Sequence, residues 1–364
     1  MATDPNPAVE PLRRGAGVDW VPLYLITLML AMFLLVIAAV GQQGTDRVRP
    51  QNPCLHRVRC GWYAYPPGAP SAPRRRAPAG PVVPGAPGAP SHDPQSDTLP
   101  HYPAILPGGR TTIFGPGRTL VAYYGTAGTG SLGVLGEASP DRIMPRLLKA
   151  AAPFARGGRT VQPVFELIAT VVHAHPGPHG TYSSDIPRAE VTAYIEAAHR
   201  HGALVVLDLQ TGRADFLSVA KRWAWALKDP WVGLALDPEW RMGPHQVPAH
   251  VIGSVSAAEV NRTSLWLDQL TAADGLPQKV FMLHEFRTSM IRNITRIRPR
   301  AHLAMVQHVD GFGPPGEKLS TFHAVADPAQ FVLGFKLFYH QDVPRMTPER
   351  VLAIRPKVSF VSFQ

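Results

Sequence analysis

Cysteine is almost absent from this sequence, which has two cysteines in 364 residues. A small secreted scaffold held together by disulfides is therefore excluded, because such a fold needs several cysteine pairs. The Gly-X-Y repeat of collagen is missing, and a hydrophobic content of 45% is too high for a wholly disordered chain. The chain also lacks a nucleotide-binding glycine-lysine loop and a Gly-x-Ser-x-Gly nucleophile elbow. What is present must therefore be found in patterns along the chain.

Charged residues make up only 17% of the chain, and the net charge of +10 comes from 36 basic and 26 acidic side chains. The basic surplus is spread out: residues 1–110 hold 10 basic and 6 acidic residues, and the remainder holds 26 and 20. A nucleic-acid-binding protein usually concentrates its basic residues on one face or in one run. We therefore expect no nucleic-acid partner.

Residues 21–40 form a long apolar run of 20 residues without a charge. As a helix rising 1.5 Å per residue, this run would be about 30 Å long, the thickness of the hydrocarbon core of a bilayer. A cleaved secretory signal has a shorter apolar region of roughly 7–15 residues, although cleavage near residue 41 stays open. We expect a short cytoplasmic tail at residues 1–20 and a single-pass membrane anchor at residues 21–40.

The orientation of this anchor is less clearly marked. Two arginines precede the apolar run and four follow it, at residues 47, 49, 57 and 59. This distribution alone favours a cytoplasmic location for the part that follows, but long domains translocate largely regardless of flanking charge. We expect the later part of the chain to lie on the extracytoplasmic side of the cell membrane.

Residues 61–110 contain 13 prolines and 7 glycines. Because proline lacks an amide donor and has a fixed φ, such a segment cannot form a helix or a central strand. We expect residues 41–117 to be a disordered Pro/Gly-rich linker that tethers the following domain. Cys54 and Cys60 lie in this linker, and they could close a small disulfide loop outside the cell. Whether they pair is left open.

From about residue 118, short apolar runs alternate with helical patterns. We expect eight strands, at residues 119–124, 163–171, 203–209, 232–237, 279–284, 302–308, 331–338 and 358–363. Several are continuous apolar runs, as is typical of parallel strands that are buried on both faces. Helices are expected near residues 141–153, 187–201, 215–227, 256–271, 287–297, 317–326 and 347–354.

This alternation predicts that residues 118–364 form an α/β domain, a (β/α)8 TIM-type barrel. Because the eighth strand lies at the end of the sequence, the barrel is expected to lack its last helix. An open doubly wound sheet is the alternative. It is less favoured, since no Gly-x-Gly-x-x-Gly turn leads from a strand into a helix.

Barrel active sites lie at the carboxyl ends of the strands, where this sequence places many polar residues. The catalytic candidates are Glu166, Asp208, Asp237, Glu239 and Glu285. The candidates for substrate binding are Tyr124, Gln210, Trp240, His284, His308, Asp310, Lys336 and Tyr339.

Asp237 and Glu239 give the strongest signal among these candidates, because residues two apart on a strand share a face. Two carboxylates at such close range raise the pKa of one of them, which leaves a neutral acid beside an ionised partner. Glycoside hydrolysis requires this division of roles. The structural alternative is an Asp237 that caps the next helix and a Glu239 paired with Arg241.

The run GLALDPEW at residues 233–240 resembles the fourth-strand Asp-x-Asp-x-Glu motif of chitinase-like glycosidases. It is also similar to the Asp-x-Glu strand end of the barrel lysozymes that cleave peptidoglycan. The resemblance implies that Glu239 is the general acid and Asp237 its assisting partner. Ala235 departs from the pattern, since it stands where the chitinase motif has its first Asp.

A wider set of segments resembles a family of uncharacterised, membrane-anchored or exported actinobacterial barrel proteins. These segments are AYYGTAGTGSLGVLGE, LALDPEWRMGP, HEFRTSMIRN and MVQHVDGFG, so this resemblance extends over most of the barrel domain. It implies a fold and a location, and it brings no established reaction with it.

Taken as a whole, the sequence favours a glycoside hydrolase that acts on an envelope or extracellular polysaccharide without a metal or cofactor. A non-catalytic carbohydrate-binding barrel is one alternative, because a fold does not guarantee chemistry. The other is a metal-dependent, amidohydrolase-like enzyme that uses His173, His175, His284 and His308. In that class the His-x-His pair lies on the first strand, whereas here it follows the second. The sugar, the linkage and the oligomeric state stay open.

Overall fold

The computed structural model describes residues 99–177 and 179–364. The predicted anchor at residues 21–40, both cysteines and most of the predicted linker lie outside these residues. Within the described part of the chain, no helix is both long enough and apolar enough to span a bilayer.

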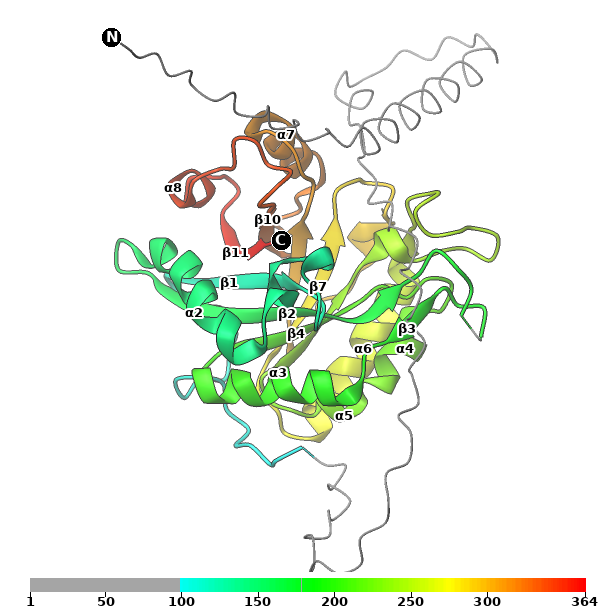
Figure 1. The fold of residues 1–364 in the computed structure, drawn as a ribbon, viewed down its shortest axis with the longest axis horizontal. Coiled ribbons are helices and arrows are strands. Elements are labelled where there is room, and N and C mark those ends of the chain that lie inside the picture. Colours follow the sequence, from blue (N-terminus) through cyan, green and yellow to red (C-terminus); the bar gives the residue numbers. More distant parts are fainter. Residues whose placement is uncertain (1–98, 178) are drawn as a thin grey trace, which may run out of the picture. The chain divides into compact units, whose positions relative to one another are not determined.

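Eight parallel strands close into a barrel, as the sequence predicts (Figure 1). The strands are β1 (Arg118–Gly125), β2 (Thr160–Val172), β4 (Leu204–Leu209), β5 (Val232–Leu236), β7 (Lys279–Glu285), β9 (Leu303–Val309), β10 (Val332–Leu337) and β11 (Val358–Phe363). They follow one another around the barrel in chain order, and β11 pairs with β1 to close it. The open-sheet alternative is therefore wrong. A short strand, β3 (Ser183–Asp185), runs antiparallel to the end of β2.

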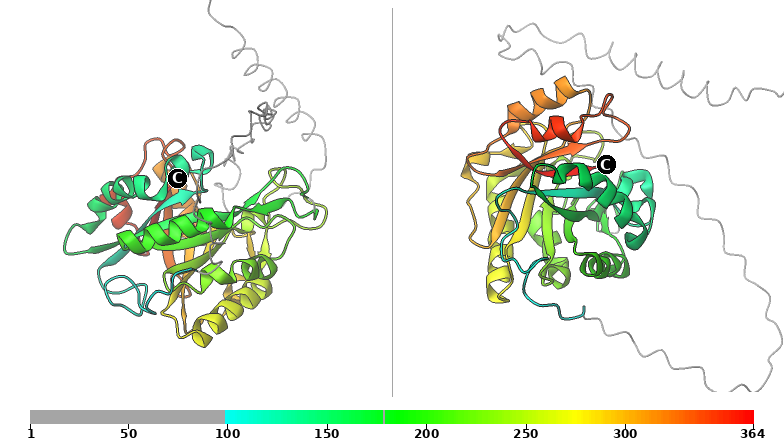
Figure 2. Two further views of the ribbon diagram at one scale, coloured as in Figure 1. Left: turned by 60° about the horizontal axis from the view of Figure 1, so that its bottom comes forward. Right: turned by 90° about the vertical axis from the view of Figure 1, so that its left-hand side faces the viewer.

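Helices follow most of the strands and pack on the outside of the barrel (Figures 1 and 2). The α-helices are α2 (Pro140–Ala151), α3 (Arg188–His201), α4 (Phe216–Arg222), α5 (Ala224–Leu227), α6 (Ala257–Ala273), α7 (Pro315–Val325) and α8 (Pro348–Leu352). The 3₁₀ turns are η2 (Gly130–Leu132), η3 (Val134–Glu137), η4 (Ala152–Ala155), η5 (Pro238–Trp240) and η6 (Ile294–Arg296). Local signals set some of these bounds: α3 ends at His201, and Gly202 caps it with a left-handed φ of 70°.

The helix expected at residues 287–297 is wrong. This stretch holds a two-residue strand, β8 (Ile291–Arg292), which pairs in parallel with β6 (Val255–Ser256). Asn293 follows with a φ of 58°, a left-handed conformation that interrupts a regular helix. The apolar residues that suggested a helix here belong in part to β8, whose partner strand β6 lies more than 30 residues earlier in the chain.

Side chains of the strands alternate between the interior of the barrel and the layer beneath the helices. Toward the amino-terminal ends of the strands, the interior is apolar. The side chains there include Leu120, Ala122, Val164, Leu204, Val206, Ala235, Val280, Met282, Ala304, Val306 and Phe360. The alternate residues, such as Val121, Phe165 and Leu207, belong to a larger core between strands and helices. This period of two decides which strand-end residues face the interior.

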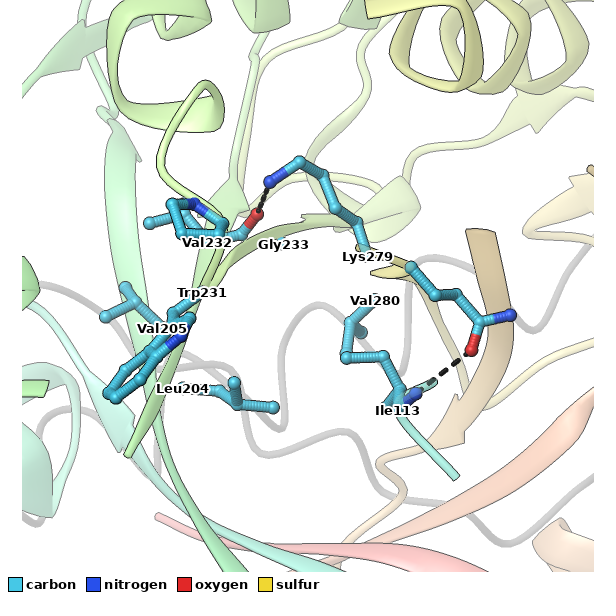
Figure 3. Close-up of a pocket in the computed structure, with 10 residues that line it drawn as sticks. Ile113, Leu204, Val205, Trp231, Val232, Gly233, Lys279 and Val280 are labelled. Carbon is cyan, nitrogen blue, oxygen red and sulfur yellow. Dashed lines mark hydrogen bonds between the residues drawn. The ribbon is translucent and has the colours of Figure 1, made fainter. Parts of the chain in front are cut away.

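Residues 99–117, which the sequence analysis assigns to the disordered linker, pack against the barrel and close its amino-terminal end. Leu106 and Ile113 are buried against the interior cluster, and the Ile113 amide donates to Oε1 of Gln278 at 3.0 Å. Figure 3 shows this end, where the crevice lined by Ile113, Trp231 and Lys279 leaves about 0 Å³ for a water-sized sphere. The end opposite the predicted site is therefore sealed.

Lys279 lies at this sealed end, and its side chain is buried. Its ammonium group donates to the backbone oxygens of Asp229 at 2.7 Å and Val232 at 2.9 Å, the latter visible in Figure 3. Burial lowers the pKa of Lys279 to about 7, although Asp229 and Asp274 favour the charged form. Between pH 7 and the usual range of lysine, the unfolded chain therefore binds a proton that the folded chain does not.

This difference makes Lys279 a source of pH-dependent stability. As the pH rises from 7 to 9, the folded state should gain up to about 1.4 kcal/mol per pH unit from this group. Lys279→Met should lack this gain, so its free energy of unfolding should rise less over that interval, as measured by urea denaturation. The exposed Lys221→Met is the control and should follow the wild type. Identical pH slopes for all three proteins would contradict the assignment.

Candidate functional site

Polar side chains replace apolar ones at the inward positions nearest the carboxyl ends of the strands. Seven of the eight strands contribute one, Asp237 directly follows β5, and none of these residues is more than 3% exposed. We call these residues the interior polar cluster: Tyr124, Glu166, Asp208, Asp237, His284, His308, Lys336 and Ser362. Asp310, just beyond β9, contacts two members of this cluster.

The imidazole of His284 joins carboxylates from different strands. Its Nδ1 lies 3.0 Å from Oδ2 of Asp310, its Nε2 lies 3.0 Å from Oε1 of Glu166, and Oδ1 of Asp208 is 4.0 Å from Nε2. Burial by itself lowers the pKa of His284, but the contacts with Asp310 and Glu166 outweigh burial and raise the pKa well above its usual value. The two carboxylates therefore favour the protonated form of His284.

A second group of contacts surrounds the Tyr124 ring. The phenol donates to Oδ2 of Asp208 at 2.8 Å and accepts from Nε2 of Gln210 at 3.4 Å. The Lys336 ammonium lies 3.4 Å from the centre of the same ring and 3.9 Å from Oδ2 of Asp310. Burial raises the pKa of Asp208 to about 6, although the charge of His284 opposes this rise. Tyr124 and Gln210 are thus engaged in internal contacts.

Asp237 and Glu239 lie at the end of β5, where Pro238 begins η5. Asp237 is 2% exposed, whereas Glu239 is only partly buried. Burial raises the pKa of Glu239 to about 8, and the Asp310 charge adds to this rise. Burial and the charges of Asp208 and Glu239 raise the pKa of Asp237 well above its usual value. The Glu239 charge thus acts on Asp237, but the pKa values of both carboxyl groups are raised. Because β5 ends at Leu236 and Glu239 lies in η5, the two residues do not share a strand face as the spacing predicts.

The structure does not show the alternative arrangement, in which Asp237 caps the next helix and Glu239 pairs with Arg241. Arg241 donates from Nε to Oε1 of Glu259 at 2.9 Å, so its carboxylate partner is Glu259 rather than Glu239. Asp237 makes no side-chain hydrogen bond to the turn that follows it. Glu239 is left at the rim, next to the interior polar cluster.

Glu285 has to be removed from the set of catalytic candidates. It directly follows the inward-facing His284 on β7, so alternation turns its side chain away from the interior. Its Oε2 accepts from Nε2 of Gln307 at 2.6 Å, and burial raises its pKa to about 7. Glu285 lies in the layer between strands and helices, and the structure does not bring it to the cluster.

The other two aromatic candidates, Tyr339 and Trp240, are both partly exposed but differ in their contacts. Tyr339 stacks on Phe363 with ring centres 5.6 Å apart, and the Arg345 guanidinium lies 4.4 Å from the centre of the Tyr339 ring. These contacts occupy the ring of Tyr339, so it is a poor stacking platform for a sugar. Trp240 is partly exposed at the end of η5, beside Glu239.

A cavity of about 310 Å³ opens at the carboxyl ends of β1, β10 and β11. It is lined by Gly130, Ser131, Gly133, Val134, Glu137, Arg146, Tyr339, His340, Gln341 and Gln364. Nη2 of Arg146 and Oε2 of Glu137 form an ion pair at 2.7 Å in its wall. The volume is at the lower end of the range found for small-molecule sites.

The histidines expected in a metal-dependent enzyme do not all meet. His173 is partly exposed, with Nε2 2.6 Å from Oγ of Ser184, and His175 is exposed. The group of described residues that could hold a metal ion is instead Glu166, His284 and His308, whose candidate ligand atoms all lie within 4.8 Å of one another.

Two buried residues of this region were not among the site candidates. Ser362 lies with Oγ 2.7 Å from Nε2 of His308, and alternation along β11 from Phe360 could have placed it inside. Lys318 of α7 donates to the backbone oxygen of Lys336 at 2.8 Å and lies 3.1 Å from Asp342. No sequence signal marks Lys318, because a lysine in a helix is ordinarily exposed.

No protein-family model matches this chain, and no curated protein matches it. The function must therefore be inferred from the geometry of the site.

A substitution at Gly334 tests how closely the His308 ring packs inside the interior polar cluster. It lies opposite His308 in the pairing of β10 with β9, and a Cβ at this position would collide with Nδ1 of the imidazole. Gly334→Ala should lower the free energy of unfolding by about 1–3 kcal/mol, because the ring has to leave its position. Gly316→Ala in α7 is the control, since nothing lies within 4 Å of its Cβ. Equal stability of the two variants in chemical denaturation would refute this packing.

Proposed function

We propose that the barrel is a glycoside hydrolase that cleaves a polysaccharide at the carboxyl ends of its strands, with Glu239 as the proton donor. The observation that carries this proposal is the position of Glu239, a partly exposed carboxyl group beside a buried, charged cluster. With a pKa of about 8, this carboxyl group holds its proton at neutral pH. A general acid has to be protonated before it can protonate a leaving group.

The neighbours of Glu239 support the rest of this chemistry. Asp237 is two residues away and interacts with it electrostatically, in keeping with an assisting role. Glycosidic cleavage develops positive charge on the sugar ring. The Asp310 carboxyl group, whose pKa is kept below its usual value, supplies a fixed negative charge near Glu239 that favours this positive charge.

The cavity at the carboxyl ends of β1, β10 and β11 suits a polar ligand, although Asp237, Glu239 and Trp240 are not among the residues that line it. Its 310 Å³ are lined by hydroxyl, amide and charged side chains, which suit a polar ligand rich in hydroxyl groups. Trp240, at the rim next to Glu239, offers an aromatic surface of the kind on which sugar rings pack. These features also suit a binding module, so only turnover separates the two classes.

Replacement of the proposed proton donor distinguishes a glycoside hydrolase from a carbohydrate-binding module. Glu239→Gln keeps the shape of the side chain and removes its titratable proton, so hydrolysis should fall about 10²–10⁴-fold while glycan binding persists. The experiment measures released reducing ends and binding for peptidoglycan, chitin and α-glucans. The exposed Glu190→Gln of α3 is the control and should retain full activity. A wild type that binds a glycan without cleaving it would be a binding module, and full activity of Glu239→Gln would exclude Glu239 as the acid.

We further propose that the barrel lies outside the cytoplasmic membrane, attached through residues 21–40. The support is the apolar run and the proline-rich segment that follows it in the sequence. An envelope polysaccharide would be accessible from that location.

Protease treatment of intact cells tests this location. It should release a resistant fragment of roughly 250 residues, the usual size of a barrel, because the proline-rich segment is the accessible place to cut. A cytoplasmic marker protein has to stay intact in the same sample. If the barrel is protected in intact cells and digested only after lysis, the orientation is the reverse of the one proposed.

A further inference from the structure

We propose that Glu166, His284 and His308 bind one divalent transition-metal ion, of the zinc class, in the interior of the barrel. The three side chains come from β2, β7 and β9, and each is fully buried. Their candidate ligand atoms all lie within 4.8 Å of one another. This site is independent of the polysaccharide activity, because nothing in its argument uses Glu239 or a glycan.

The donor set and its dimensions suit such an ion. Two imidazole nitrogens and one carboxylate oxygen are a set that zinc uses in catalytic sites, with a fourth position open. Metal–ligand bonds of roughly 2.0–2.1 Å place ligand atoms about 3.3 Å apart in a tetrahedron. Nε2 of His284 and Oε1 of Glu166 are already 3.0 Å apart. The candidate ligand atoms lie within 4.8 Å of one another, so small side-chain movements would complete the set.

Buried atoms without hydrogen bonds gather around this point. Within residues 99–177 and 179–364, both carboxylate oxygens of Glu166, Nε2 of His284 and Nδ1 of His308 have no hydrogen-bond partner. Although Nε2 of His284 and Oε1 of Glu166 are close, their contact does not have the geometry of a hydrogen bond. Each unsatisfied buried polar group costs about 1–3 kcal/mol. One cation would give several of these atoms a partner at once.

The remaining contacts of the two histidines hold their rings in place. Nδ1 of His284 lies 3.0 Å from Oδ2 of Asp310, and Nε2 of His308 lies 2.7 Å from Oγ of Ser362. A ligating histidine ordinarily has its other ring nitrogen fixed by a carboxylate or another polar group, which sets the orientation of the ring. Gly334 allows the close approach of the His308 ring to β10, because a Cβ there would collide with Nδ1.

The charge of the surroundings also favours a cation. Glu166, Asp208 and Asp237 are buried carboxyl groups at this depth, and each has at least one oxygen without a hydrogen bond among the described residues. The Lys336 ammonium does not compensate them directly, since it lies over the Tyr124 ring on the side of Asp310. A divalent ion that replaces the Nε2 proton of His284 would add one net positive charge at the centre of the cluster. Its binding displaces the Nε2 proton of His284 to the solvent, as metal ligands require.

Direct metal binding tests the site without any assay of hydrolysis. The full chain, purified in detergent and treated with a chelator, is titrated with Zn²⁺ and with Co²⁺. The expected result is one equivalent bound, with the visible absorption of four-coordinate Co²⁺ and a higher melting temperature when Zn²⁺ is present. No binding of either ion by the folded wild type would overturn the proposal.

Matched variants locate the ion. His308→Gln and Glu166→Gln should weaken Zn²⁺ binding by about 100-fold or more. His173→Gln, which alters a histidine outside the site, should bind like the wild type. Wild-type affinity in both site variants, or loss of binding in His173→Gln, would place the ion elsewhere and refute this set of ligands. Circular dichroism first establishes that each variant is folded. Because no glycan is present, the result neither depends on nor decides the role of Glu239.

Discussion

The buried imidazole of His284 is the group on which the arrangement of the barrel mouth depends. It lies between the Glu166 carboxylate of β2 and the Asp310 carboxylate that follows β9, at 3.0 Å from each. An ionised carboxylate in a dry interior costs several kcal/mol unless a positive group or hydrogen bonds compensate it. His284 supplies this compensation across the width of the barrel. Burial raises the pKa of Asp208 and Asp237, and the charge of His284 opposes this rise in both groups.

The geometry of parallel strands separates stability from chemistry in this barrel. Inward positions alternate along each strand, so Val206 and Asp208 share a face of β4, as Met282 and His284 share a face of β7. Val206 and Met282 belong to the apolar interior, whereas Asp208 and His284, which are nearer the carboxyl ends of the strands, belong to the interior polar cluster. The same alternation excludes Glu285, which directly follows His284.

Much of the fold could be predicted because its determinants are local. The apolar strand runs and the turn signals between them lie within a few residues of one another, as at Gly202 after α3. The stretch around Asn293 could not be predicted in this way, because β8 pairs with β6, which is distant along the chain. Period-two spacing predicts a shared strand face for Asp237 and Glu239, but β5 ends at Leu236 and Glu239 lies in the turn η5.

The contacts across the barrel could not be obtained from the sequence in the same way. That the Glu166 carboxylate reaches His284, and that Ser362 fixes His308, depends on the stagger between strands and on the closure of β11 against β1. No local pattern encodes this stagger, since it arises from the whole set of pairings. For this reason the sequence suggested His173 and His175 as partners for a metal, whereas the structure brings Glu166 to His284 and His308.

Burial divides the chemical roles between two depths. Glu166 and His284 are completely buried, so a polymeric substrate cannot touch them, whereas Glu239 is partly exposed at the rim. Asp310 connects the two levels. Contact with His284, together with the nearby Lys336 charge, keeps the pKa of Asp310 below its usual value despite burial. The resulting negative charge in turn raises the pKa of Glu239. Because the two pKa values are driven apart, Glu239 can keep its proton at the rim while Asp310 stays ionised inside the barrel.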